Sequence, residues 1–475
     1  MLKIKIAIIT AALLLANAAL GFSMIGNNKL EYRGARAGEG DEFFENRLDL
    51  RLSVSNISVG ARFEAMQPSR SSAITRPDSS YTAITQRWAQ LESDVVEITA
   101  GTYTATMGGG LLLDARERRE IQEDHHLDGV RANVRTPLAD ISVLSGVADW
   151  NTIDDFTIRG GEIQTKIPYI PVGAGYIHYS DEAEAPLADM IGETWEVRAM
   201  PSWREFAAEV HYAETWRGEN PGGYQLDGSA LYITASAAAG PVTLFGQYLQ
   251  ADSFLVNGYG SGSALVTLPL VVRQPSYTLM SRHLEELSPV EVTAVSEEVF
   301  VFLNSGWELE GSFALVAKPD DENYYEIYGS LQNDWGDLHL KGLYELQQFP
   351  GDDILHNVVI EPLYYLSDRA SLLADFELQT GTEYGQDVTH FYGLTEFALS
   401  PYGAVGIEGG ALEEYSGGEL ETQYFARLYI DGRIAENHRL TLAVGRRPGG
   451  FTCSGGSCRY EPEFEGVELK LTSSF

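Results

Sequence analysis

The sequence is poor in cysteine, in basic residues and in long apolar runs. Two of its 475 residues are cysteines, Cys453 and Cys458, and 33 Lys and Arg stand against 68 Asp and Glu. This formal charge of −35 argues against a nucleic-acid partner, because binding to phosphates requires a basic surface. After the N-terminus no stretch is apolar and long enough for a membrane helix, although short alternating strands would escape that test.

Motifs of catalysis and metal binding are also lacking. We find no Gly-x-Ser-x-Gly elbow, and the nine histidines follow no catalytic pattern. The stretch Asp124-His125-His126-Leu127-Asp128 holds metal-ligand side chains, but neighbouring histidines on a strand point to opposite faces. We therefore predict no enzymatic activity, no cofactor and no metal.

The first 21 residues have the pattern of a secretory signal peptide. Lys3 and Lys5 precede the apolar run Ile6–Leu15, and Ala16-Asn17-Ala18 is a small-x-small cleavage site. Cleavage is expected after Ala18 or Gly21, and the alternative is an N-terminal membrane anchor. Residues 22–475 are then expected to form one domain, because nothing ahead of the first strand is long enough for a separate plug.

The last ten residues, Gly466–Phe475, alternate strictly between apolar and polar side chains. Val467, Leu469 and Leu471 take one face of a strand, and Glu468 with Lys470 takes the other. The strand ends on an aromatic residue, as in Gram-negative outer-membrane β-barrels, which this terminus resembles. The resemblance implies that the barrel-assembly machinery reads Phe475, and that outer-membrane lipids and lipopolysaccharide surround the protein.

The rest of the chain also alternates like the strands of a transmembrane barrel. In Arg47–Val54 the leucines and valine alternate with charged residues, and a similar strand follows the turn Ser55-Asn56. Eleven short connections alternate with twelve longer ones. This predicts a closed antiparallel barrel of about 24 strands (22–26), with short periplasmic turns, long extracellular loops and both termini in the periplasm.

Two stretches of the chain resemble one particular family of outer-membrane barrels. Gly101–Asp114 with Leu127–Val130, and Tyr277–His283, resemble a family of uncharacterised outer-membrane barrels. That resemblance implies no particular activity.

A barrel of this width cannot be filled by its wall side chains alone, so its lumen holds water or is plugged. We predict that two long loops fold inward, Met107–His126 and Ser253–Glu291. The apolar run Ala264–Val272 in the second loop is expected to pack inside the barrel mouth or against a partner. The alternative for this run is an exposed hairpin.

Charge is distributed unevenly along the chain. Residues 22–136 contain 14 Lys and Arg against 17 Asp and Glu, whereas residues 137–475 contain 17 against 51. The arginines of the first strands could therefore form a basic strip inside an acidic wall, or they could pair with Glu45, Asp49 and Glu64 to hold that wall. The candidate lumen and constriction residues are Arg47, Arg51, Arg62, Arg131, Arg135, Asp114, Arg116, Arg118 and Arg119.

The sequence thus predicts a pore or substrate-selective channel for small hydrophilic solutes. The alternative is a plugged barrel that serves as a structural, surface or assembly partner without transport. Cys453 and Cys458 are expected to form a disulfide in the last extracellular loop, since both compartments that an exported chain meets are oxidising.

Overall fold

The computed structural model describes most of the chain after the predicted signal peptide. The described residues are 22–36, 42–67, 80–118, 123–148, 156–181, 191–217, 227–254, 266, 268–283, 291–319, 323–351, 353–416, 419–454, 457–461 and 463–475. The predicted signal peptide and Arg119 lie outside them.

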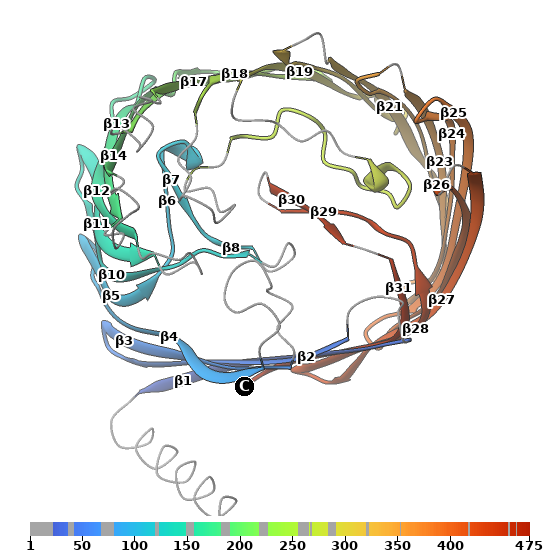
Figure 1. Ribbon diagram of the computed structural model, residues 1–475, viewed down its shortest axis with the longest axis horizontal. Helices are drawn as coiled ribbons and strands as arrows, with labels where there is room; N and C mark the ends of the chain where they lie inside the picture. Colours follow the sequence, from blue (N-terminus) through green and yellow to red (C-terminus); the bar gives the residue numbers. More distant parts are fainter. Residues whose placement is uncertain are drawn as a thin grey trace, which may run out of the picture.

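The chain forms a closed ring of 24 antiparallel strands (Figure 1), which confirms the predicted all-β barrel and its strand number. Each strand pairs with the next along the chain. The ring closes where β1 (Ser23–Ala35) pairs with β31 (Phe464–Ser474), in a register that places Tyr32 opposite Leu469. Closure leaves no edge strand, so the main-chain groups of the wall are paired within the sheet.

The wall strands between β1 and β31 differ in length. They are β2 (Phe43–Val54), β3 (Ile57–Gln67), β4 (Tyr81–Glu92), β5 (Val96–Tyr103), β10 (Leu127–Arg135), β11 (Ala139–Ala148), β12 (Phe156–Thr165), β13 (Val172–Asp181), β14 (Ile191–Ala199), β15 (Ser202–Trp203), β16 (Phe206–Arg217), β17 (Gly228–Ala239), β18 (Val242–Asp252), β19 (Glu291–Phe302), β20 (Glu308–Ala317), β21 (Tyr324–Trp335), β22 (Leu338–Gln348), β23 (Ile354–Ser367), β24 (Ala370–Glu383), β25 (Gln386–Leu399), β26 (Gly403–Ser416), β27 (Glu419–Ala435) and β28 (His438–Arg447). The short β15 pairs with β16 beyond the end of β14.

Among the described residues, six short strands and two 3₁₀ helices lie off the wall. They are β6 (Ala105–Met107), η1 (Gly108–Gly110), β7 (Leu113–Ala115), β8 (Glu117–Arg118), β9 (Glu123–Asp124), η3 (Met280–Arg282), β29 (Gly450–Ser454) and β30 (Ser457–Glu461). Figure 1 shows β6, β7 and β8, the stretch around η3, and the hairpin β29–β30 inside the ring.

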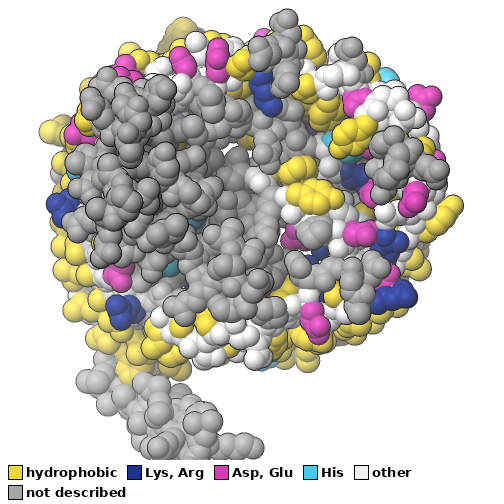
Figure 2. Space-filling view, viewed as in Figure 1, with side chains coloured by type: hydrophobic (Ala, Val, Ile, Leu, Met, Phe, Trp, Pro, Cys, Tyr) yellow, Lys and Arg dark blue, Asp and Glu magenta, His cyan; other side chains and the backbone are white. Residues whose placement is uncertain are grey.

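The alternation of each strand separates an apolar outer face from a polar inner face. On β31, Val467 is 39% exposed on the outside, whereas Glu468 is 7% exposed on the inside. Exposed apolar residues recur on the outer face of the wall, for example Leu244, Ile327 and Ile360. Hydrophobic side chains accordingly cover much of the outer rim in Figure 2. This is the arrangement expected for a barrel surrounded by lipid.

The short and long connections follow the predicted alternation. Tight turns join β2 to β3 at Ser55-Asn56 and β27 to β28 at Glu436-Asn437, and the start of β1 and the end of β31 lie at this same end. β21 continues through Trp335, and the turn that joins it to β22 lies at Gly336-Asp337. Gly336 has φ 61°, a conformation that glycine adopts without a Cβ clash.

The terminal Phe475 is part of the barrel seam. Its backbone N–H donates to the carbonyl oxygen of Gly26 (2.9 Å), and its carbonyl oxygen accepts from the N–H of Gly26 (2.7 Å). Its ring covers Gly26, where an added Cβ would lie 2.3 Å from the ring. The ring itself is 55% exposed, so it remains available on the surface of the strand pair that closes the barrel.

Deleting Phe475 is expected to lower the folded outer-membrane fraction, because the change removes the exposed aromatic terminus and two backbone hydrogen bonds of the closing seam. Heat-modifiable gel mobility measures that fraction. The matched control is Phe475→Trp, which retains an aromatic terminus. Equal folded levels for the deletion and the wild type would contradict a role of Phe475 in assembly.

Candidate functional site

Three parts of the chain enter the ring from its long-loop end. The first inner segment comprises residues 104–118 and 123–126, between β5 and β10. The second inner segment comprises residues 266 and 268–283, between β18 and β19. The third inner segment is the hairpin β29–β30, between β28 and β31. The prediction that Met107–His126 and Ser253–Glu291 fold inward is confirmed for their described residues.

The first inner segment turns at its three glycines. Gly108, Gly109 and Gly110 have φ values of 59°, 63° and 100°, all in the region that favours glycine. The backbone N–H of Gly108 donates to Glu162 on β12 (3.1 Å). An added Cβ at Gly109 would lie 3.4 Å from the ring of His211, an ordinary contact distance, so the turn lies beside β16 at this point.

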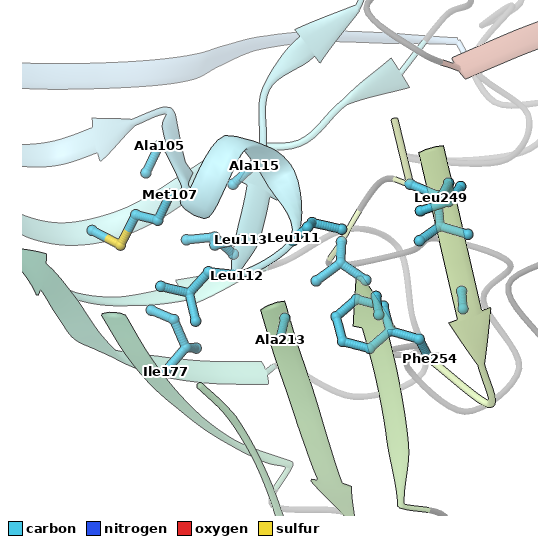
Figure 3. Packing of buried hydrophobic residues seen from close by; sticks show 14 of the residues in the cluster. Ala105, Met107, Leu111, Leu112, Leu113, Ala115, Ile177, Ala213, Leu249 and Phe254 are labelled. Atoms are coloured by element: carbon cyan, nitrogen blue, oxygen red, sulfur yellow. The ribbon is translucent and has the colours of Figure 1, made fainter. Parts of the chain in front are cut away.

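An apolar layer attaches the first inner segment to the wall. Leu111, Leu112 and Leu113 are at most 2% exposed and belong to a cluster with Ile177 and Phe254. Figure 3 shows Leu112 next to Ile177 of β13, and the cluster also includes Ala213 of β16 and Leu249 of β18. The wall members of this cluster lie near the long-loop ends of their strands. Burying each leucine stabilises the docked segment by about 1.5–3 kcal/mol, so the segment is a fixed part of the interior.

A charged turn follows this apolar layer. Asp114 is fully buried and pairs with Arg116 and Arg118. The hydrogen bond to Asp114 raises the pKa of the Arg116 guanidinium above its usual value. Three of the four predicted constriction residues of this loop therefore form one ion-pair cluster. The fourth, Arg119, lies outside the described residues.

The adjacent Glu117 joins the first inner segment to the basic strip on the opposite part of the wall. It pairs with Arg47 on β2 and with Arg62 on β3 (2.9 Å from Nη1). Asp49 also pairs with Arg62, Nε to Oδ1 at 2.6 Å. The structure contains the expected pair of Arg47 with Asp49 (Nε to Oδ2, 3.8 Å), and Glu117 is a partner that the sequence pattern did not reveal.

Arg51 and the arginines of β10 have other partners. Arg51 donates to Ser53 and Ser58 and lies over the Trp88 ring at 5.5 Å. On β10, Arg131 and Arg135 both donate to Glu97 of β5, at 3.0 and 3.2 Å. Among the candidate arginines of the wall, Arg47 and Arg62 pair with Glu117 of the first inner segment, and Arg131 also donates to the carbonyl oxygen of Thr104 in that segment (2.7 Å). Arg51 and Arg135 donate to side chains of the wall instead.

The second inner segment begins with the apolar run that was expected inside the barrel mouth. Its described members Val266, Leu268, Val271 and Val272 are buried in the same cluster as the three leucines of the first inner segment. Further along, Tyr277 and Met280 pack with Tyr328, Leu343 and Val359. The prediction for this run is confirmed for these residues.

Polar contacts hold the end of the second inner segment. The two carboxylate oxygens of Glu377 on β24 accept from the backbone N–H groups of Thr278 (2.9 Å) and Leu279 (2.6 Å). Gln379 donates to the carbonyl oxygen of Leu279 at 3.2 Å. Both side chains are at most 1% exposed. Nothing in the sequence pattern indicated this role for Glu377, because it joins residues about a hundred positions apart.

Two arginines and one histidine of the second inner segment also pair with the acidic wall. Arg273 pairs with Glu310 and stacks on Tyr328, its guanidinium carbon 3.5 Å from the ring centroid. Arg282 lies 3.3 Å from Glu414, and His283 lies 3.0 Å from Glu383. The segment therefore brings positive charge to the acidic side of the lumen.

That acidic wall extends over β19 to β26. Its carboxylates occupy alternate, inward-facing positions on neighbouring strands, and several are almost completely buried. The members are Glu298, Glu310, Glu326, Glu345, Glu361, Asp375, Glu377, Glu383, Glu408 and Glu414. The uneven charge along the sequence thus places an acidic wall on one side of the lumen, opposite the arginines of β2, β3 and β10.

The third inner segment lies against the second, because Gly450 is in contact with Ser281. The prediction concerned a loop tip between the last two strands, whereas the hairpin extends inside the ring (Figure 1). Its register places Cys453 opposite Cys458. The side chain of Cys453 lies outside the described residues, so the disulfide stays a prediction.

No described helix is both long and apolar enough to span a membrane. No group of three or more His, Cys, Asp or Glu within the described ranges is arranged to hold a metal ion.

Comparisons with known proteins place the chain in a family and support the fold. The model of a family of unknown function (DUF6029) matches residues 29–310 and 345–475. A search of curated proteins finds no match. Among solved structures, the Escherichia coli P pilus tip assembly intermediate PapC-PapD-PapK-PapG aligns with a TM-score of 0.57 and 8% identity, over 95% of this chain and 60% of that chain.

Two further solved structures align less well. The P pilus usher PapC translocation pore has a TM-score of 0.45 and 7% identity, over 95% of this chain and 99% of that one. The siderophore receptor PirA from Pseudomonas aeruginosa has a TM-score of 0.48 and 9% identity, over 95% of this chain and 80% of that one. At sequence identities this low, the similarity supports the fold alone, which is a large closed barrel of the outer-membrane type.

Proposed function

The chain belongs to this family of unknown function, DUF6029, and we propose that it forms a pore of the Gram-negative outer membrane for small hydrophilic solutes, narrowed by its own inner segments. The observation that carries the proposal is the contrast between the two faces of the wall. Apolar side chains face outward, and the inner face carries the acidic wall and the arginines of β2, β3 and β10. A charged inner face suits water and ions, whereas a purely structural barrel does not need one.

The inner segments would set the size limit of this pore. The first and second are attached to the wall by the apolar layer, so they narrow the lumen at its long-loop end rather than opening as mobile lids. Toward the short-turn end the wall remains polar. Solutes would pass between the acidic wall and the arginines, where opposed charges create a transverse field.

The test is conductance in planar bilayers with the purified full-length barrel. We expect discrete single-channel steps in the current. In asymmetric KCl the reversal potential should show selectivity for cations, because Asp and Glu outnumber Lys and Arg 68 to 33. Anion selectivity would show that the arginines control passage. A barrel that is folded by gel mobility but silent at all voltages would refute the pore.

The same apolar layer favours a second candidate function. Inner segments that are so firmly packed suit a plugged barrel that acts as a structural, surface or assembly partner. Such a barrel would be silent in bilayers and would co-purify with a stoichiometric partner. The conductance measurement therefore separates the two candidates.

Several features remain proposals alongside the pore. They are cleavage of a signal peptide after Ala18 or Gly21, a single barrel domain over residues 22–475, insertion by the barrel-assembly machinery, contact with lipopolysaccharide, and the disulfide between Cys453 and Cys458.

A further inference from the structure

A cavity of about 330 Å³ lies inside the barrel next to β6. The first inner segment contributes Ala105, Thr106 and Met107, and the wall contributes side chains of β10, β11 and β12. Arg135 and Asp140 flank the short turn between β10 and β11, so the cavity extends from β6 toward the short-turn end. Its volume is near the lower end of the roughly 300–1,000 Å³ typical of small-molecule sites.

The β10 side of the cavity carries one excess positive charge. Arg131, Arg135 and Asn133 all donate to a single carboxylate, that of Glu97, at 3.0, 3.2 and 3.3 Å. Two guanidinium groups therefore share one carboxylate. Arg135 has 51% of its side chain exposed, and within the described residues only its Nη2 is hydrogen bonded, so its other donors are available to a ligand.

The acidic groups on the opposite side are already paired. Asp140 lies 2.7 Å from Lys166. Glu162 accepts from Arg198 (2.9 Å), which also donates to Glu196 (3.1 Å), and from the backbone N–H of Gly108 (3.1 Å). Each acidic group that lines the cavity thus has a cationic partner, whereas Arg131 and Arg135 share the single carboxylate of Glu97.

We propose that this cavity binds a small hydroxylated monocarboxylate of the size of a monosaccharide acid. The ligand's carboxylate would take a paired hydrogen bond from the Arg135 guanidinium, the geometry in which arginine binds carboxylates best. Its hydroxyl groups would exchange hydrogen bonds with Asn133, Ser142 and Gln164, which line the same cavity. This inference rests on the proposed pore, of which the cavity would be the selective subsite.

The charge balance excludes two other ligand classes. A dianion such as a phosphate monoester would have one negative charge beyond the single excess positive charge, and it would lie close to Asp140 and Glu162. A neutral sugar has no carboxylate that could pair with the remaining donors of Arg135. The site therefore favours one negative charge combined with several hydroxyl groups.

The test uses the full-length barrel in a planar bilayer, with glucuronate, glucose and glucose 6-phosphate added in turn. We expect glucuronate to block the current at a concentration roughly tenfold or more below that of the other two. Arg135→Gln should raise the half-blocking concentration of glucuronate by a similar, roughly tenfold factor. The matched control is Arg439→Gln on β28, an arginine held by Asp431 (2.8 Å) outside the cavity, and it should leave the block unchanged.

Calorimetric titration of the detergent-solubilised barrel with glucuronate separates the two proposals. Conductance without any preference for glucuronate would overturn the binding site and leave the pore standing. A silent barrel that still binds glucuronate, with binding lost in Arg135→Gln, would overturn the pore and leave the site standing. Equal affinity in the wild type and Arg135→Gln would also overturn the site.

Discussion

Deleting Asp114–Glu123 is expected to raise single-channel conductance while the barrel still folds. The deletion removes the charged turn of the first inner segment, together with Glu117, but it leaves Leu111–Leu113 packed on the wall. A wider lumen carries more current. Loss of Glu117 also leaves Arg47 and Arg62 with less negative charge around them. The reversal potential should therefore shift toward weaker cation selectivity.

The substitution Glu117→Gln is the matched control for this deletion. It removes the charge that pairs with Arg47 and Arg62 but keeps the length of the first inner segment. We expect the same direction of shift in reversal potential with little change in conductance. Unchanged conductance in the deletion variant, with a normally folded barrel, would mean that the charged turn does not narrow the conducting path.

Substituting Glu377 by alanine is expected to loosen the second inner segment. The buried N–H groups of Thr278 and Leu279 would each lose their acceptor, at a cost on the order of 1–3 kcal/mol apiece. The apolar run at Leu268–Val272 remains packed, so the detachment should be confined to the part around η3. The expected results are higher conductance with frequent transitions and faster labelling of a Ser281→Cys reporter.

Two variants sharpen this experiment. Glu377→Gln keeps one carbonyl oxygen as an acceptor and should give an intermediate effect. Glu308→Ala is the matched control, because Glu308 accepts from Gln332 of the neighbouring strand rather than from the inner segment. If Glu377→Ala labels Ser281→Cys no faster than Glu308→Ala does, the polar contacts of Glu377 do not hold the segment.

The sequence by itself determined the barrel, its strand number and the orientation of its faces. Strand alternation has a period of two residues, so Val467 and Glu468 have to face opposite sides wherever the strand lies. Short and long connections have to alternate in an up-and-down barrel, and this local pattern predicted 24 strands. The glycines before Leu111 and the apolar run Ala264–Val272 likewise marked the two inward loops, because their requirements are local.

Only the tertiary structure decided what the interior contacts are. Glu117 reaches Arg47 across the lumen, and Glu377 reaches Leu279 from nearly a hundred residues away. Glu97 gathers Arg131 and Arg135 because the register of β5 with β10 places them together. Such pairs depend on strand order, register and loop path, and none of them has a periodicity along the chain. Charge and alternation placed these side chains in the lumen, and the closed barrel selected their partners.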